Sequence, residues 1–151
     1  MKRWLAVVVL VACSRKSPPP PAPAPIDPFN SAAECQRYLA RAKPALEQAL
    51  TAASSNDMTD AQPLRDRAAA MGKARALLGV EPSVASANAH YKRALGTLDG
   101  LASAFSTLAA SREPNAPANP EVPLVAQKVL ILRKQLDDAV KTTPSICDAA
   151  K

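Results

Sequence analysis

The single histidine limits the acid–base and metal chemistry open to this 151-residue chain. His90 stands beside Tyr91, and helical spacing surrounds it with serine, alanine and arginine side chains that seldom bind metals. The chain has no second histidine and no Cys-x-x-Cys-His stretch that could hold a covalent haem. We therefore expect no metal site and no cofactor, and interpret His90 as a structural or solvent-facing side chain.

Adjacent carboxylates at Asp137 and Asp138 are the pair best placed for general acid–base catalysis. Two consecutive residues of a helix point about 100° apart, however, so these carboxylates would not face each other. Lys134 and Lys141 lie at helical spacing and offer them ordinary ion-pair partners. The serines lack Gly-x-Ser-x-Gly and Ser-x-x-Lys motifs, and the glycines form no phosphate-binding loop. We therefore expect the protein not to be an enzyme.

The first residues of the chain contain an apolar run that ends next to a cysteine. Cys13 follows an apolar run, residues 4–12, which is preceded by Lys2 and Arg3. A charged region followed by a short apolar region is typical of an export signal. The run has nine residues, whereas about 20 are needed to cross a bilayer. The sequence therefore predicts a signal peptide at residues 1–12. The alternative is a soluble protein in which the run forms a buried helix or strand.

The signal ends in Leu10-Val11-Ala12 and is followed by Cys13, which gives an aliphatic residue, two small or β-branched residues and a cysteine. This order resembles the lipobox of bacterial lipoproteins, and the resemblance covers only the export segment. It implies that cleavage follows Ala12 and that Cys13, the new N-terminus, carries a thioether-linked diacylglycerol. Acyl chains of this kind hold a protein at a membrane without a transmembrane helix. By the same analogy, Ser14 favours the outer membrane over the inner one in a diderm cell.

Seven prolines follow between residues 14 and 29, with no regular apolar period. This composition predicts a disordered, extended, Pro-rich tether rather than part of a fold. Sixteen residues at about 3.1 Å each would reach on the order of 50 Å. We therefore expect residues 13–29 to comprise the lipidated cysteine and its tether, and residues 30–151 to form one domain.

Cys35 and Cys147 remain near the two ends of this domain once Cys13 is assigned to lipid. Exported proteins fold in an oxidising compartment, so we expect these two cysteines to form a disulfide. The loop that it would close is more than a hundred residues long, and chain entropy then gives a stabilisation of roughly 4.7 kcal/mol. The alternative is a pair of buried, unpaired thiols.

The region beyond residue 30 is rich in alanine, leucine, arginine and glutamine, a composition that favours helices. A first helix is expected to begin at a capping box formed by Ser31 and Glu34. Pro44 is expected to kink it or to divide it into two abutting helices. A second helix is expected after Thr59, where Gln62 completes another capping box.

The remaining helix boundaries are marked by glycine and proline. Gly79 is expected to end the second helix, and a third should run from near Pro82 to just before Pro114. The third helix has the most regular apolar spacing in the chain. The fourth ends at Pro144, and its apolar residues alternate at spacings of three and four, as in helices that pack against antiparallel neighbours. They are Val122, Val125, Val129, Leu132, Leu136 and Ala139.

The cysteines and the helix count point to one topology. An even number of helices in up-down order returns the end of the chain to its beginning, where Cys35 and Cys147 could meet. The predicted fold is therefore all-α, an up-down four-helix bundle closed by a disulfide. Gly96 and Gly100 have Gly-x-x-x-Gly spacing, and their polar neighbours favour close packing within the bundle over pairing in a membrane.

The charge pattern argues against a nucleic-acid partner. The formal net charge is +6, the basic residues occur as pairs rather than runs, and few aromatic side chains follow the export segment. We expect a non-enzymatic lipoprotein of the cell envelope, anchored to a membrane by lipid with its domain in the periplasm. Its bundle would be structural or bind another envelope protein. The alternative is a periplasmic carrier of an acyl chain or other apolar ligand between alanine-rich helix faces.

Overall fold

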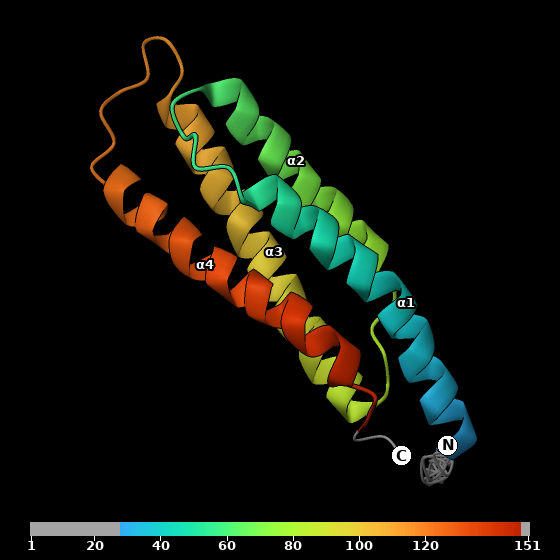
Figure 1. Ribbon diagram of the computed structural model, residues 1–151. Coiled ribbons are helices and arrows are strands. Elements are labelled where there is room, and N and C mark those ends of the chain that lie inside the picture. Colours follow the sequence, from blue (N-terminus) through green and yellow to red (C-terminus); the bar gives the residue numbers. More distant parts are fainter. Residues whose placement is uncertain (1–27, 149–151) are drawn as a thin grey trace, which may run out of the picture.

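Four α-helices form the regular structure of residues 28–148, which are the residues that this computed structural model describes (Figure 1). They are α1 (Pro28–Ala53), α2 (Ala61–Leu78), α3 (Ala85–Ser111) and α4 (Val122–Thr142), and a short 3₁₀ turn, η1 (Thr143–Ser145), follows α4. No strand occurs among the described residues. The described part of the chain is thus an all-α helical bundle, as its composition predicts.

Glycine and proline end the helices where the sequence predicts. α2 stops before Gly79, whose φ of +69° lies in the left-handed region that glycine adopts without strain. α3 ends at Ser111, shortly before Pro114, and α4 passes into the turn that contains Pro144. Glycine and proline therefore set the lengths of α2, α3 and α4 and the positions of the loops between them.

The four helices lie side by side along one long axis (Figure 1). α3 packs extensively on both α2 and α4, and α1 packs mainly on α2. α2 and α4 therefore occupy diagonal positions in the bundle. The seam between α1 and α4 is the least closely packed of the four seams between neighbouring helices.

Alanine and leucine dominate the core, so the helices approach one another closely. One close approach is at Gly100, where an added Cβ would lie 3.0 Å from Cδ1 of Leu132. At Gly96 an added Cβ would meet nothing within 4 Å. The packing role predicted for the two glycines is therefore confirmed at Gly100 only. The largest fully buried side chains are Tyr38, Phe105, Leu46, Leu64, Met71, Leu78, Leu98, Leu101, Leu108, Leu136, Val129 and Thr143.

The inward face of α2 differs from the one that the sequence predicts. Helical spacing of the apolar residues Leu64, Ala68, Met71 and Leu78 places Arg75 on that face, but Arg75 is exposed and forms an ion pair with Asp99, with 3.2 Å between Nε and Oδ1. Arg67 is the buried arginine, and its guanidinium carbon lies 5.9 Å from the ring centroid of Phe105. The methylene groups of an arginine can pack like apolar surface while its guanidinium group stacks on an aromatic ring. A prediction based on residue polarity therefore does not find the buried face of α2.

Pro44 neither ends nor divides the first helix, because α1 continues through it to Ala53. A proline within a helix removes a hydrogen bond and costs about 3 kcal/mol. The neighbouring side chains Ala42, Ala45 and Leu46 are fully buried, whereas Pro44 itself is exposed. Tertiary packing of this face therefore outweighs the local penalty.

Both predicted capping boxes are wrong. α1 begins before Ser31, and the carboxylate of Glu34 instead accepts hydrogen bonds from the backbone N–H and hydroxyl of Ser83, which precedes α3. Thr59 donates its backbone N–H and its hydroxyl to Oδ1 of Asp57 rather than capping α2. In both cases the side chain finds a partner that the local motif does not include.

The predicted signal peptide, the lipidated cysteine at Cys13 and the predicted tether up to residue 27 lie outside the described residues, whereas Pro28 and Phe29, which the prediction assigns to the tether, belong to α1. Among the helices that are described, none combines the length and the apolar character needed to cross a membrane. The part of the fold that positions a candidate site is therefore the bundle closed by Cys35 and Cys147.

Candidate functional site

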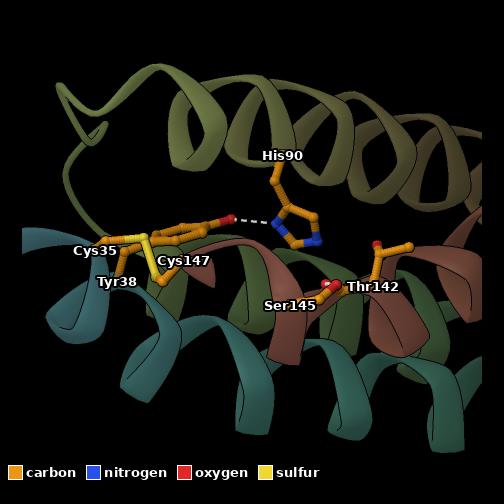
Figure 2. The surroundings of a disulfide bond; sticks show 6 residues. All are labelled: Cys35, Tyr38, His90, Thr142, Ser145 and Cys147. Carbon is orange, nitrogen blue, oxygen red and sulfur yellow. Dashed lines mark hydrogen bonds between the residues drawn. A yellow bond between two sulfur atoms is a disulfide. The ribbon is translucent and has the colours of Figure 1, made fainter. Parts of the chain in front are cut away.

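The disulfide between Cys35 and Cys147 joins the first helix to the segment after η1 (Figure 2). The two Cα atoms are 5.9 Å apart, although 112 positions separate the cysteines in the sequence. The predicted bridge is confirmed, and the alternative of two unpaired thiols is wrong. Both cysteines are buried. The bridge holds the first turns of α1 next to the segment that follows η1.

A buried hydrogen-bonded pair lies beside this disulfide (Figure 2). The hydroxyl of Tyr38 on α1 is 2.7 Å from Nδ1 of His90 on α3, and Nε2 of His90 is 3.1 Å from the backbone oxygen of Ala139 on α4. A carbonyl oxygen only accepts, so Nε2 carries the ring hydrogen. In a neutral ring Nδ1 then accepts the hydrogen of the Tyr38 hydroxyl. The geometry fits a neutral histidine that links three helices.

The surroundings of His90 complete this cluster. Thr143, in η1, donates its hydroxyl to the same Ala139 oxygen at 2.7 Å. The ring of Tyr38 lies edge-on to His90, with centroids 5.8 Å apart, and edge-on to Tyr91 at 6.2 Å. We call Tyr38, His90, Ala139 and Thr143 the His90 cluster. It binds α1, α3, α4 and η1 together at the end of the bundle that the disulfide closes.

Burial sets the charge state of the cluster. Desolvation lowers the pKa of His90 below its ordinary value, the charge of Arg93 lowers it further, and the hydrogen bond to Ala139 opposes this shift. Desolvation also raises the pKa of Tyr38 far above its ordinary value. Both side chains are therefore uncharged near neutral pH. Tyr38 is fully buried and His90 is 7% exposed, so the cluster is suited to joining helices rather than to meeting a substrate.

The carboxylate pair singled out in the sequence lies on the surface of α4. Asp137 forms an ion pair with Lys141 at helical spacing, and Asp138 is exposed. The structure does not bring either carboxylate to His90 or to a shared metal position. Within the described part of the chain, no group of three or more histidine, cysteine, aspartate or glutamate side chains is arranged to hold a metal ion.

Open grooves run along the seams between helices. The groove between α3 and α4 has a volume of about 460 Å³, and the groove between α2 and α3 about 300 Å³. The groove between α1 and α4, of about 520 Å³, has Leu50 and Leu130 on its walls together with charged side chains of α4. The charged lining residues of this groove are Arg133, Lys134 and Asp137.

The sequence allowed a structural role for His90, but it did not link this residue to Tyr38. The two residues are 52 positions apart, so no local spacing links them. The only available signal was that His90 lies in the predicted helix with the most regular apolar spacing.

Comparisons of the chain with protein-family models, with curated proteins and with solved structures find no significant match. The function is therefore argued from the residues and the geometry of this chain.

Proposed function

We propose that the protein is a lipid-anchored lipoprotein of the cell envelope whose helical bundle is a non-enzymatic structural or protein-binding module. In this proposal residues 1–12 are removed, Cys13 carries the lipid, and the Pro-rich segment holds the bundle away from the membrane. The bundle faces the periplasm, and in a diderm cell the outer membrane is the favoured location. Another envelope protein is the proposed partner.

The disulfide is the observation that carries this proposal. Stable disulfides form in oxidising compartments outside the cytosol, so the Cys35–Cys147 bridge supports export of the chain. The chain has three cysteines, and the bridge uses two of them. Cys13 is the remaining cysteine, and it stands at the lipidation position of the signal. Export and anchoring are thus supported by residues at different places in the sequence.

The proposal includes up-down connectivity of the helices. Glu34, near the start of α1, binds Ser83, just before α3 begins. His90, near the start of α3, binds Ala139, near the end of α4. These contacts support α1 and α3 running in one direction with α4 running in the other. In this order the tether and the C-terminal segment leave the bundle at the same end.

The acyl-chain carrier is a less favoured function. A carrier of this kind needs an enclosed, mainly apolar cavity. The grooves along the α1–α4, α2–α3 and α3–α4 seams are open, and each has charged side chains on its walls. The alanine-rich helix faces, which suggested a carrier in the sequence, are instead packed against each other.

Metabolic labelling with palmitate tests the anchor. We expect wild-type protein to incorporate label and the Cys13→Ala variant to incorporate none. The Cys35→Ala/Cys147→Ala double variant is the matched control, because it removes the other cysteines and should label like wild type. Equal labelling of wild type and Cys13→Ala would show that the lipid is not attached at Cys13 and would overturn the proposal.

A further inference from the structure

The outward side of α4 carries large apolar side chains. Leu124, Leu130 and Ile131 are 65%, 57% and 59% exposed, respectively, although each could pack in a core. Leu124 and Ile131 are seven positions apart and therefore lie on the same side of the helix. Leu130 points about 100° away from Ile131, toward the edge of this side where it lines the groove between α1 and α4. Of the five large hydrophobic side chains that are exposed among the described residues, these three lie on one helix. They are therefore concentrated on α4 rather than scattered over the bundle.

Cations flank these side chains. Between Glu121 and Asp137, α4 carries Lys128, Arg133 and Lys134 and no acidic residue, and the exposed carboxylate of Asp138 lies on the same side as Ile131 at the C-terminal edge of this segment. Arg133 is engaged, since it donates hydrogen bonds to Asn56 and to the backbone oxygen of Ser54. Lys128 and Lys134 are exposed, and neither has an acidic partner among the described residues. We call Leu124, Lys128, Leu130, Ile131 and Lys134 the α4 face.

A second copy of the chain fits the α4 face poorly. In a two-fold dimer the same patch meets itself, which would bring lysines against lysines. A stable interface buries about 800 Å² on each partner, far more than three partly exposed side chains supply. An anionic lipid surface fits both properties of the face. Apolar side chains enter the boundary between headgroups and acyl chains, and lysines above them pair with anionic headgroups.

We propose that the α4 face docks on the surface of a bilayer containing anionic lipids, so that the bundle rests on its side against the membrane. This inference rests on the proposed lipid anchor, which would keep the bundle near a membrane. A face this small would bind weakly from free solution, but an anchored bundle meets the surface at a high effective concentration. Residues 14–27 separate the proposed anchor from α1, and about 3.1 Å per residue leaves room for the bundle to lie down.

Tryptophan fluorescence on vesicles tests this docking. The chain has a single tryptophan, Trp4, so Trp4→Phe with Ile131→Trp places one reporter on the α4 face. The full chain carries an N-terminal hexahistidine tag and is held by nickel-chelating lipid on phosphatidylcholine vesicles, with or without phosphatidylglycerol. We expect bromine-labelled lipids to quench this reporter when phosphatidylglycerol is present. A reporter made by Trp4→Phe with Ala69→Trp, on the exposed side of the diagonal helix α2, should not be quenched.

Charge variants in the same assay test the role of the lysines. A basic side chain at an anionic surface contributes about fivefold to binding, so Lys128→Gln with Lys134→Gln should weaken docking about 25-fold. Lys43→Gln with Lys73→Gln removes the same charge from exposed sites on α1 and α2 and is the matched control. Docking by the control variant should be unchanged. High salt should release the wild-type face, because the lysine contribution is screened.

Three results would overturn the docking proposal. One is equal quenching of the α4 and α2 reporters, and another is quenching of the α4 reporter that does not depend on phosphatidylglycerol. The third is a change in α4-reporter emission that grows with protein concentration in the absence of vesicles, which would assign the face to a second copy. The tag replaces the natural lipid, so these results do not depend on palmitate labelling of Cys13. The anchor and the docking face can therefore fail independently.

Discussion

At the scale of single residues, the structure turns an ambiguous histidine into a defined structural element. His90 uses both ring nitrogens, accepting from the Tyr38 hydroxyl and donating to the Ala139 oxygen. Protonation at Nδ1 would place a second hydrogen against a hydroxyl that now donates. It would also put a positive charge in a buried site near Arg93. The folded protein therefore favours the neutral ring.

This preference predicts how stability changes with pH. The pKa of His90 is lowered in the folded protein from an ordinary value of 6.5, so the unfolded chain takes up this proton first. The stabilisation is complete above about pH 6.5, falls as the pH decreases, and is fully lost below the folded-state pKa. The slope is at most about 1.4 kcal/mol per pH unit. Denaturation in urea between pH 5 and 7 measures it.

Two further measurements isolate His90. The chain has one histidine, so His90→Gln should remove the pH dependence in this window. The carboxylates of Glu34 and Glu81, whose pKa values are lowered by hydrogen bonds from Ser83 and from Asn88 and Lys92, affect stability only below their ordinary value of 4.5. If the glutamine variant does not fold, the imidazole resonances of wild-type His90 followed by NMR give its pKa directly. A value at or above 6.5 would contradict the argument.

At the scale of elements, the two glycines of α3 form a natural matched pair. Glycine within a helix is about 0.5–1 kcal/mol less stable than alanine because its backbone loses more freedom on folding. At Gly96 the extra methyl group would meet open space, whereas at Gly100 it would press on Leu132 at 3.0 Å. The same substitution therefore has different consequences one turn apart.

We expect Gly96→Ala to raise the free energy of unfolding by about 0.5–1 kcal/mol. Gly100→Ala should gain less or lose stability, because the Leu132 side chain must move to admit the methyl group. Gly72→Ala, which also meets nothing within 4 Å, is the control for the helix-propensity gain. Urea denaturation of the three variants measures the difference. Equal gains at Gly96 and Gly100 would show that Leu132 does not restrict α3.

The helices also show which sequence signals are reliable. Apolar period predicted four helices and much of their core, because burial of a helix face is repeated over many residues. The predictions of capping boxes were wrong because each depends on a single side-chain contact. The carboxylate of Glu34, for example, accepts a hydrogen bond from Ser83, which is 49 positions away in the sequence. Arg67 was missed because its burial depends on Phe105 of another helix. Contacts between distant segments leave no local pattern in the sequence.

At the scale of the whole molecule, the disulfide and the His90 cluster reinforce the same end of the bundle. Cys35 and Tyr38 lie on one turn of α1, and Cys147 follows the η1 turn that holds Thr143 (Figure 2). The cysteine pair could be predicted from cysteine count and compartment, whereas the cluster could not. The opposite end has no disulfide among the described residues, and its polar contacts are exposed, such as that from Arg112 to the Met58 backbone oxygen at 3.1 Å. The proposed tether enters at the reinforced end.

Removing the bridge should therefore destabilise the whole bundle through its unfolded state. The bridge closes a loop across 112 positions, for which chain entropy predicts a loss of roughly 4.7 kcal/mol. We expect this loss for Cys35→Ala with Cys147→Ala, measured by urea denaturation, and an equal loss on reduction of the wild-type protein. Cys13→Ser should keep full stability and full sensitivity to reductant. If reduction left the free energy of unfolding unchanged, packing of the His90 cluster alone would hold the chain ends together, and the bridge would contribute nothing to stability.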